Sequence, residues 1–156
     1  NAFSDASFAN CPITRKSHYG YFLRYGENIF GWRSKLQSIP ALSSRDSELI
    51  ASVECIKHLL GVRFFLCETG FLHDGPTPVR IDNKASLEGI RNDKISKSSM
   101  YMGYRLAWVR HQLKDGLIDL SHVASEENLS DILTKALKCD LLKELRTKVL
   151  RNYELI

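Results

Sequence analysis

The stretch Ala41-Leu42-Ser43-Ser44-Arg45-Asp46-Ser47-Glu48-Leu49-Ile50-Ala51 opens the longest helix that the sequence predicts. Ser43 or Ser44 is a good N-cap, because its hydroxyl can accept a hydrogen bond from an unpaired amide two or three residues later. Asp46 completes a loose capping box with Ser43 and suits the positive end of the helix dipole. Beyond the cap, apolar residues at helical spacing predict one buried stripe, formed by Leu49, Val53, Ile56 and Leu60.

Glu48 lies in the first turns of this helix, beside the apolar stripe and not opposite it. An isolated Glu at such a place is most simply a solvated side chain or a partner of the helix dipole. A functional interpretation gains weight here because three aspartates occupy marked positions elsewhere. Asp5 lies within the first predicted strand, Asp82 ends a strand, and Asp131 comes early in a late helix.

Length and composition indicate an ordinary globular protein. The 156 residues fit a single domain, 1–156, with a substantial core, and 44% of them are hydrophobic and 26% charged. We find no run of eighteen apolar residues and no signal-peptide pattern, so we expect no association with a membrane. We expect an intracellular, cytoplasmic location. Because the chain starts without Met in an apparent strand, we also expect it to be a piece of a larger polyprotein.

The cysteines and the charges exclude some classes of function. The four cysteines lack C-x-x-C spacing and the five histidines are scattered, so a zinc site is not expected and a reducing compartment is the default. The net charge of +4 is uneven: residues 84–114 hold seven basic and two acidic residues, with Tyr101, Tyr104 and Trp108 among them. Such a segment suits a phosphate backbone. A solvated helix face with aromatics packed inward is the simpler interpretation, and taken alone the better one.

The predicted elements follow the order βββ-α-β-α-α-β-α-α. We expect strands at 2–8, 18–25, 29–35, 79–82 and 117–123, with a hairpin turn at 26–28. We expect helices from Ser43 or Ser44 to about Glu68, at 84–92, at 99–114, from Ser125 onward, and an amphipathic tail helix over about 138–156 capped by Asp140. A meander followed by β-α units implies an α/β fold with a five-stranded mixed sheet flanked by helices. Ligands gather at the carboxyl ends of strands in such sheets, which places Asp82 and Asp5 on one rim.

Four carboxylates gathered on one rim would repel one another and raise each other's pKa. A fold tolerates such a cluster mainly when divalent cations neutralise it. Oxygen ligands without His or Cys select Mg²⁺ or Mn²⁺. Two such ions about 4 Å apart would clamp the attacking and leaving oxygens of a phosphoryl transfer. Composition alone does not show that Asp5, Glu48, Asp82 and Asp131 converge.

A family resemblance supplies that step. Ser4-Asp5-Ala6, Arg15-Lys16-Ser17 before Gly20-Tyr21, and Leu42-Ser43-Ser44 leading to Glu48 resemble the RNase H domain of copia-type LTR retrotransposon polyproteins. Ile81-Asp82-Asn83-Lys84-Ala85-Ser86 and Asn128-Leu129-Ser130-Asp131-Ile132-Leu133-Thr134-Lys135 continue the similarity. It runs in order, at fitting spacings, from about Phe3 to Leu150. The Asp-Asn strand end and the Asp-Ile-Leu-Thr-Lys segment are its more specific motifs.

The resemblance implies an RNase H fold and metal-dependent cleavage of the RNA strand of an RNA–DNA hybrid. It implies that two Mg²⁺ ions, for which Mn²⁺ would substitute, are held by Asp5, Glu48, Asp82 and Asp131. By family analogy Asp5 bridges both ions, Asp131 helps to hold the ion that activates water, and Glu48 and Asp82 hold the other. The products would carry a 5′-phosphate and a 3′-hydroxyl. No small-molecule cofactor is implied.

The resemblance also implies partners and contacts. The partners are the hybrid and a reverse transcriptase domain of the same polyprotein, within a virus-like particle. Ser43, Ser44 and Asn83 are the side chains we expect at the 2′-hydroxyls of RNA. Thr14, Lys16 and Ser17 are those we expect at phosphates of the DNA strand.

The sequence departs from the family pattern at two places. Copia-type relatives usually carry a His and an acid where this chain has Tyr101 and Gly103. Cellular RNases H carry a His in the loop before the last Asp, whereas here the loop at 124–128 has none. His122 precedes that loop but is predicted to lie in a strand, so we assign no catalytic His.

Three alternatives stay open from the sequence. One is a catalytically silent RNase H-like module kept for binding nucleic acid or protein, against which the intact set of four acids argues. Another is a resolvase or integrase of the same fold, which a Glu in the first helix disfavours. The simplest alternative is an α/β domain with scattered surface acids.

Overall fold

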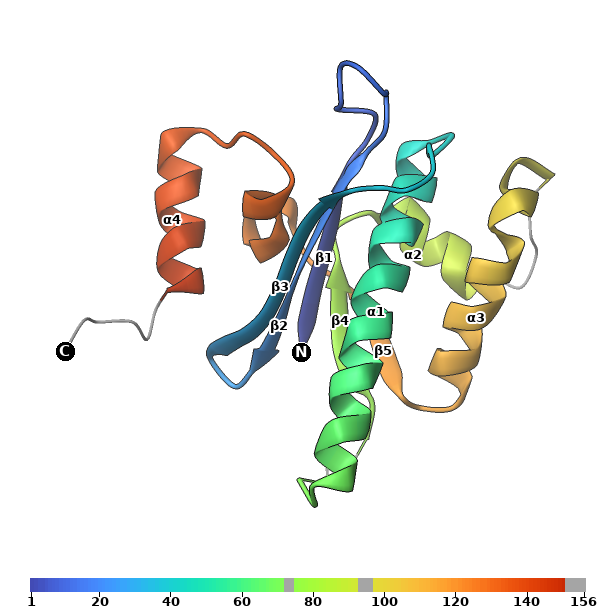
Figure 1. Cartoon of the computed structure of the whole chain (residues 1–156), viewed down its shortest axis with the longest axis vertical. Coiled ribbons are helices and arrows are strands. Elements are labelled where there is room, and N and C mark those ends of the chain that lie inside the picture. The colour runs from blue at the N-terminus through green and yellow to red at the C-terminus, as the bar shows by residue number, and fades with distance from the viewer. Residues whose placement is uncertain (72–74, 93–96, 151–156) are drawn as a thin grey trace.

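The computed structural model describes residues 1–71, 75–92 and 97–150. These residues form a mixed sheet covered by helices on both faces (Figure 1). Its strand order is β3-β2-β1-β4-β5, with β2 antiparallel to β1 and β3, and with β4 parallel to β1 and β5. The predicted five-stranded mixed sheet is thereby confirmed, with the strands β1 (Ala2–Ser7), β2 (His18–Tyr25), β3 (Asn28–Leu36), β4 (Thr77–Ile81) and β5 (Ile118–His122).

The helices divide between the two faces of the sheet. Figure 1 shows α1, α2 and α3 on one side and α4 on the other. The larger apolar core lies under α1 to α3, and a smaller one, containing Phe3, Phe22 and Leu145, lies under the C-terminal elements. Within the described residues the helices are α1 (Ser44–Glu68), α2 (Lys84–Arg91), α3 (Gly103–Lys114), α4 (Cys139–Val149) and the 3-10 helices η1 (Lys97–Met102), η2 (Ser125–Glu127) and η3 (Leu129–Leu133).

Helix α1 begins and ends where the sequence predicts. Ser43 is the N-cap: its hydroxyl oxygen accepts from the amide of Asp46 at 3.1 Å and its hydroxyl hydrogen is donated to the Asp46 carboxylate at 2.6 Å. At the other end Gly70 has a φ of +78°, and the amides of Gly70 and Phe71 donate to the carbonyls of Cys67 and Leu66. This pattern is a Schellman motif, and a residue with a side chain would be strained at its glycine.

Strand β1 is buried on both faces because it lies at the centre of the sheet. Ala2 and Ala6 belong to the core under α1, and the Ser4 hydroxyl lies 3.4 Å from that of Ser52 in α1. Side chains alternate along a strand, so Phe3 and Asp5 point to the opposite face, toward the C-terminal elements. The fold thus places a carboxylate, Asp5, in its interior.

The prediction of a helix that starts at Ser125 is wrong. The chain forms two 3-10 helices there, η2 and η3, in which amides donate three residues back: Asn128 to Ser125, and Asp131 to Asn128. The side chain of Asn128 interrupts any continuous helix. Its Oδ1 accepts from Ser130, and its amide donates across to the carbonyl of Ser4 in β1 at 3.2 Å.

Two other predicted helices have different boundaries in the structure. The 99–114 helix is η1 followed by α3, and residues 93–96 of the predicted polar loop lie outside the described residues. In α4 the N-cap is Lys138, and Asp140 lies in the first turn. The predicted tail helix is present over Cys139–Val149, while residues 151–156 lie outside the described part. No helix in the described part of the chain is long and apolar enough to cross a bilayer.

Gly20 of β2 permits the close approach of η3 to the sheet. A β-carbon at this position would lie 2.5 Å from the Leu133 β-carbon and 3.0 Å from Thr134. We expect Gly20→Ala to lower the free energy of unfolding by about 1–3 kcal/mol through overpacking. The matched control is Gly61→Ala, at an exposed position of α1 where nothing lies within 4 Å. Helix propensity predicts a gain of up to about 1 kcal/mol there. Urea unfolding measures both, and equal effects would contradict this account.

The N-cap of α1 gives a second prediction. Ser43→Ala removes the acceptor for the Asp46 amide and should cost about 1 kcal/mol. Ser44→Ala is the control, because the capping bonds of α1 come from Ser43 and Ser44 is exposed. Urea unfolding of the two variants separates the positions, and a larger loss for Ser44→Ala would assign the cap to that residue.

Candidate metal-dependent active site

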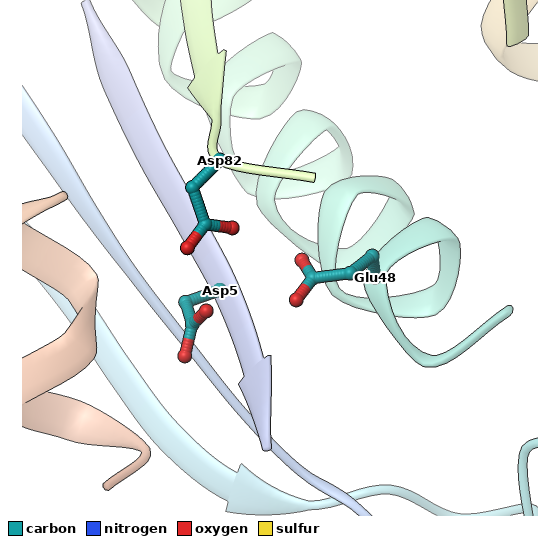
Figure 2. A group of neighbouring side chains, drawn as sticks. All are labelled: Asp5, Glu48 and Asp82. Carbon is teal, nitrogen blue, oxygen red and sulfur yellow. The ribbon is translucent and has the colours of Figure 1, made fainter. Parts of the chain in front are cut away.

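Three carboxylates converge at one end of the sheet. Asp5 lies near the carboxyl end of β1, Asp82 directly follows β4, and Glu48 reaches them from the first turns of α1. Each offers a carboxylate oxygen, and these oxygens all lie within 4.8 Å of one another. Figure 2 shows the three side chains directed toward a common space. Parallel pairing of β1 and β4 is what brings Asp5 and Asp82 to the same rim.

Glu48 is held by the strand that carries Asp5. Its Oε1 accepts from the amide of Ala6 at 3.2 Å, and only 4% of the residue is exposed. Its other oxygen, Oε2, is buried and has no hydrogen-bond partner in the described structure. An unpaired buried carboxylate oxygen is costly unless a ligand completes it.

Asp82 is the more open member of the cluster. Its Oδ2 accepts from the hydroxyl of Ser125 at 3.2 Å, and its backbone carbonyl lies 3.1 Å from Nε2 of His122. His122 lies in a strand, as the sequence predicts, and is the last residue of β5. Its ring therefore contacts the backbone beside the cluster, with Nε2 as the donor.

Asp131 lies beside this cluster and is linked to one of its members, Asp5, through Lys135. The Lys135 ammonium is 3.1 Å from Oδ1 of Asp5 and 3.0 Å from Oδ1 of Asp131. The hydroxyl of Thr134 donates to Oδ2 of Asp5. The Asp-Ile-Leu-Thr-Lys segment thus delivers an acid, a hydroxyl and an ammonium to one buried carboxylate.

The electrostatics reflect burial and crowding of like charges. Burial, then the charges of Asp5 and Asp82, raises the pKa of Glu48 well above its ordinary value. Burial, then Asp5, raises the pKa of Asp82, and the same two causes raise that of Asp131 to about 6. Burial opposes the charge of Lys135, but Asp5 and Asp131 outweigh it and raise the pKa of the ammonium.

These residues fit a divalent cation. The donors are carboxylate oxygens, which suit Mg²⁺ or Mn²⁺ and not zinc. Asp5, Glu48 and Asp82 are close enough to share an ion, and the unpaired Oε2 of Glu48 offers a lone pair to it. A cation there would also relieve the repulsion that raises the pKa values.

The residues predicted to contact RNA lie at two helix starts next to the carboxylates. Ser43 caps α1, and Asn83 caps α2 by accepting from the amide of Ser86 at 2.8 Å. The Ser86 hydroxyl donates to the carbonyl of Arg45 and ties the two helix starts together. Ser44 is exposed there. Both caps therefore have structural roles, and contact with RNA stays a prediction.

The residues predicted to contact DNA phosphate lie in the loop between β1 and β2. Thr14 is exposed, and the ammonium of Lys16 donates to the carbonyl of Ser38 at 2.8 Å. The prediction for Ser17 needs correction: the residue is 0% exposed and its hydroxyl accepts from the amide of Ala9 at 2.9 Å. Ser17 shapes the loop and has no surface to offer a phosphate.

The basic segment is partly structural. Arg91 donates to the carbonyl of Leu120 at 2.7 Å, and Arg110 donates to the carbonyls of Gly89 and Ile90. These bonds tie α2 to β5 and α3, which favours the simpler interpretation for both arginines. Tyr104, in contrast, is 94% exposed. Lys94 lies outside the described residues.

Sequence reasoning assigned no role to Thr134 and Lys135. Both stand in the motif that carried the resemblance, and Asp131 and Lys135 have the i, i+4 spacing of a helical ion pair. That spacing predicts the pairing of Lys135 with Asp131. Its contact with Asp5, 130 residues away, depends on the tertiary fold.

Comparison with known sequences points to retroelement polyproteins. No protein-family model matches the chain. The chain is 31% identical over 146 residues to the retrovirus-related Pol polyprotein of transposon TNT 1-94 from Nicotiana tabacum, covering 92% of this chain and 11% of that protein. It is 26% identical to that of transposon RE2 from Arabidopsis thaliana, covering 88% and 9%. The chain thus spans about a tenth of the length of the curated relatives that it matches.

Comparison with solved structures identifies the fold. LC11-RNase H1 in complex with RNA/DNA hybrid aligns with a TM-score of 0.62 at 15% identity, over 85% of this chain and 91% of that one. RNase H1 from the archaeon Halobacterium salinarum aligns with a TM-score of 0.57 at 14% identity, over 85% and 92%. The chain has the RNase H fold. Together with the relatives, this is consistent with an RNase H domain of a copia-type retrotransposon Pol polyprotein.

The raised pKa of Asp131 predicts a pH-dependent response to metal. Its value of about 6 exceeds the ordinary value of about 3.9, so its contribution to stability is full below about pH 4 and is lost as the pH rises through about 6. A divalent ion binds the charged carboxylates and reverses that loss. We expect saturating Mg²⁺ to raise the melting temperature by about 5–10 °C at pH 7.5 and by much less at pH 5.

Thermal unfolding followed by circular dichroism, with and without Mg²⁺, measures this response. Asp131→Asn should weaken its pH dependence, and Asp119→Asn, at an exposed position in β5, should leave it unchanged. If Mg²⁺ raised the melting temperature of the unmodified chain equally at both pH values, the role given to Asp131 would be contradicted.

Proposed function

We propose that this chain is a ribonuclease H that hydrolyses the RNA strand of RNA–DNA hybrids with two divalent cations. The observation that carries the proposal is the convergence of Asp5, Glu48 and Asp82 on one rim, with Asp131 beside them. The RNase H fold of the chain supports the proposal, and so does the similarity to Pol polyproteins. We propose one domain, acting inside the cell.

Asp5 would serve both cations, because it lies between Glu48 and Asp82 on one side and Asp131 on the other. Bound cations would supply charge neutralisation and an activated water at the scissile phosphate. Glu48 is held by the amide of Ala6 and Asp82 by the hydroxyl of Ser125, so both carboxylates are preorganised. Preorganised charge lowers the cost of reaching the transition state.

The helix starts around the carboxylates support the proposed substrate. Ser43, Ser44 and Asn83 would approach the RNA strand, where hydroxyl and amide groups can bond 2′-hydroxyls. Thr14 and Lys16, on the loop that follows β1, would contact the DNA strand. LC11-RNase H1, which shares the fold, was solved with an RNA/DNA hybrid.

Cleavage of a labelled RNA–DNA hybrid in Mg²⁺ or Mn²⁺ tests the proposal. Asp82→Asn removes one carboxylate charge with little change of shape, and we expect the rate to fall more than about 100-fold. Asp119→Asn, on the exposed side of β5, is the matched control and should keep the rate. Labelled duplex DNA in parallel reactions tests for an integrase or resolvase.

Cleavage of the RNA strand that disappears in Asp82→Asn would establish both the reaction and the site. Hybrid binding without cleavage, in an unmodified chain that is folded, would instead indicate a silent module. Cleavage of duplex DNA in preference to hybrid would overturn the substrate assignment.

We further propose that a reverse transcriptase domain of the same polyprotein supplies part of the hybrid affinity. A net charge of +4 gives a domain of 156 residues limited non-specific attraction for phosphate. Hybrid affinity of the chain alone and of the chain joined to that domain, compared at one salt concentration, measures the contribution. Equal affinities would contradict it.

A further inference from the structure

Lys135 occupies the part of the site where a cation would contact both Asp5 and Asp131. Its ammonium bonds Oδ1 of each carboxylate, at 3.1 and 3.0 Å. Asp5 is completely buried, and only 7% of the Asp131 side chain is exposed. A buried carboxylate pair of this kind requires a neighbouring positive charge. Here the chain provides that charge itself.

The other half of the site is different. Between Asp5, Glu48 and Asp82 the carboxylate oxygens lie within 4.8 Å of one another, and Oε2 of Glu48 has no hydrogen-bond partner among the described residues. Within the described residues, Lys135 forms ion pairs with Asp5 at 3.1 Å and with Asp131 at 3.0 Å. On this side of Asp5, Oε2 of Glu48 therefore has a lone pair available for an ion.

A divalent ion and the Lys135 ammonium compete for the same place. Mg²⁺ requires near-ideal octahedral geometry and carries two charges, so an ammonium bonded to Oδ1 of both acids obstructs it by contact and by repulsion. Lysine can leave such a place easily, because it is a point charge on a flexible stem. The Lys135 side chain is 35% exposed, which gives it a route to solvent.

We propose that Lys135 is a built-in counter-cation which makes the two halves of the site fill unequally. The position among Asp5, Glu48 and Asp82 binds its ion first and more tightly. The position between Asp5 and Asp131 binds only as Lys135 moves away, and therefore more weakly. Lys135 is a positioning residue for the metal-free site, and this inference rests on the proposed function.

Titration with Mn²⁺ alone, counted by the electron paramagnetic resonance of the free ion, tests the proposal without any activity measurement. The unmodified chain should show a tighter and a weaker class of site. Asp82→Asn should remove the tighter class, and Asp131→Asn the weaker one. Lys135→Met should strengthen the weaker class about tenfold or more. It should strengthen the tighter class by a smaller factor, because Asp5 belongs to both positions.

The control is Lys148→Met. Lys148 also forms an i, i+4 ion pair, with Glu144 at 2.7 Å, and is 38% exposed, but it lies on α4. The Lys148→Met substitution removes one positive charge from a similarly exposed side chain, so it measures any general effect of net charge on Mn²⁺ binding. It should leave both classes of Mn²⁺ site unchanged.

Removal of Lys135 also leaves Asp5 and Asp131 without their counter-charge. In EDTA, the Lys135→Met variant should therefore melt at a lower temperature than the unmodified chain. Mn²⁺ should raise the melting temperature of the variant more than that of the unmodified chain. If Lys135→Met does not fold, Lys135→Gln keeps a hydrogen-bond donor for Asp5 without the charge and should strengthen the weaker class in the same way.

The outcomes separate this inference from the proposed function. Two Mn²⁺ classes that Lys135→Met and Lys135→Gln leave unchanged would overturn the role of Lys135 and leave the ribonuclease proposal standing. Two equally tight sites in the unmodified chain would do the same. Absence of Mn²⁺ binding in the unmodified chain and in Lys135→Met alike would overturn both.

Discussion

The carboxylate of Asp5 is the constraint on which the rest of the site depends. A central strand covered on both faces has no access to water, and an ionised carboxylate there is unstable without a positive charge or hydrogen bonds. The fold supplies both from one segment, through the hydroxyl of Thr134 and the ammonium of Lys135. It then adds Glu48 and Asp82, which increase the need for cations and cannot be explained by stability alone.

The segment from Asn128 to Lys135 connects this electrostatic requirement to the packing of the sheet. Asn128 anchors it to β1 through the carbonyl of Ser4, and Ser34 of β3 donates to the carbonyl of Leu133 at 2.6 Å. The absence of a side chain at Gly20 lets η3 lie directly on β2. A short 3-10 segment pinned at three strands can place Asp131 and Lys135 more rigidly than a free loop would, which suits preorganised charge.

Local patterns predicted most of the fold, because local interactions form most of it. The strands and α1 follow from alternation, helical spacing, the Ser43 cap and Gly70, each of which acts within a few residues. The prediction failed after Ser125, where the acidic first turn suggests a helix but the Asn128 side chain bonds across to β1. It also failed at Ser17, which is buried and accepts from the amide of Ala9 within its own loop, because burial of a loop residue depends on the conformation of the whole loop.

For the site, the sequence by itself determined the chemical types and their places in the chain: acids in a first strand, a first helix and a strand end, and oxygen ligands suited to Mg²⁺. Parallel pairing of β1 with β4 then predicted that Asp5 and Asp82 share a rim. Only the tertiary structure decided that Glu48 reaches them and that Lys135 lies between Asp5 and Asp131. The physical reason is that Glu48 is 43 residues from Asp5 and 34 from Asp82, and Lys135 is 130 from Asp5, so tertiary packing sets these distances.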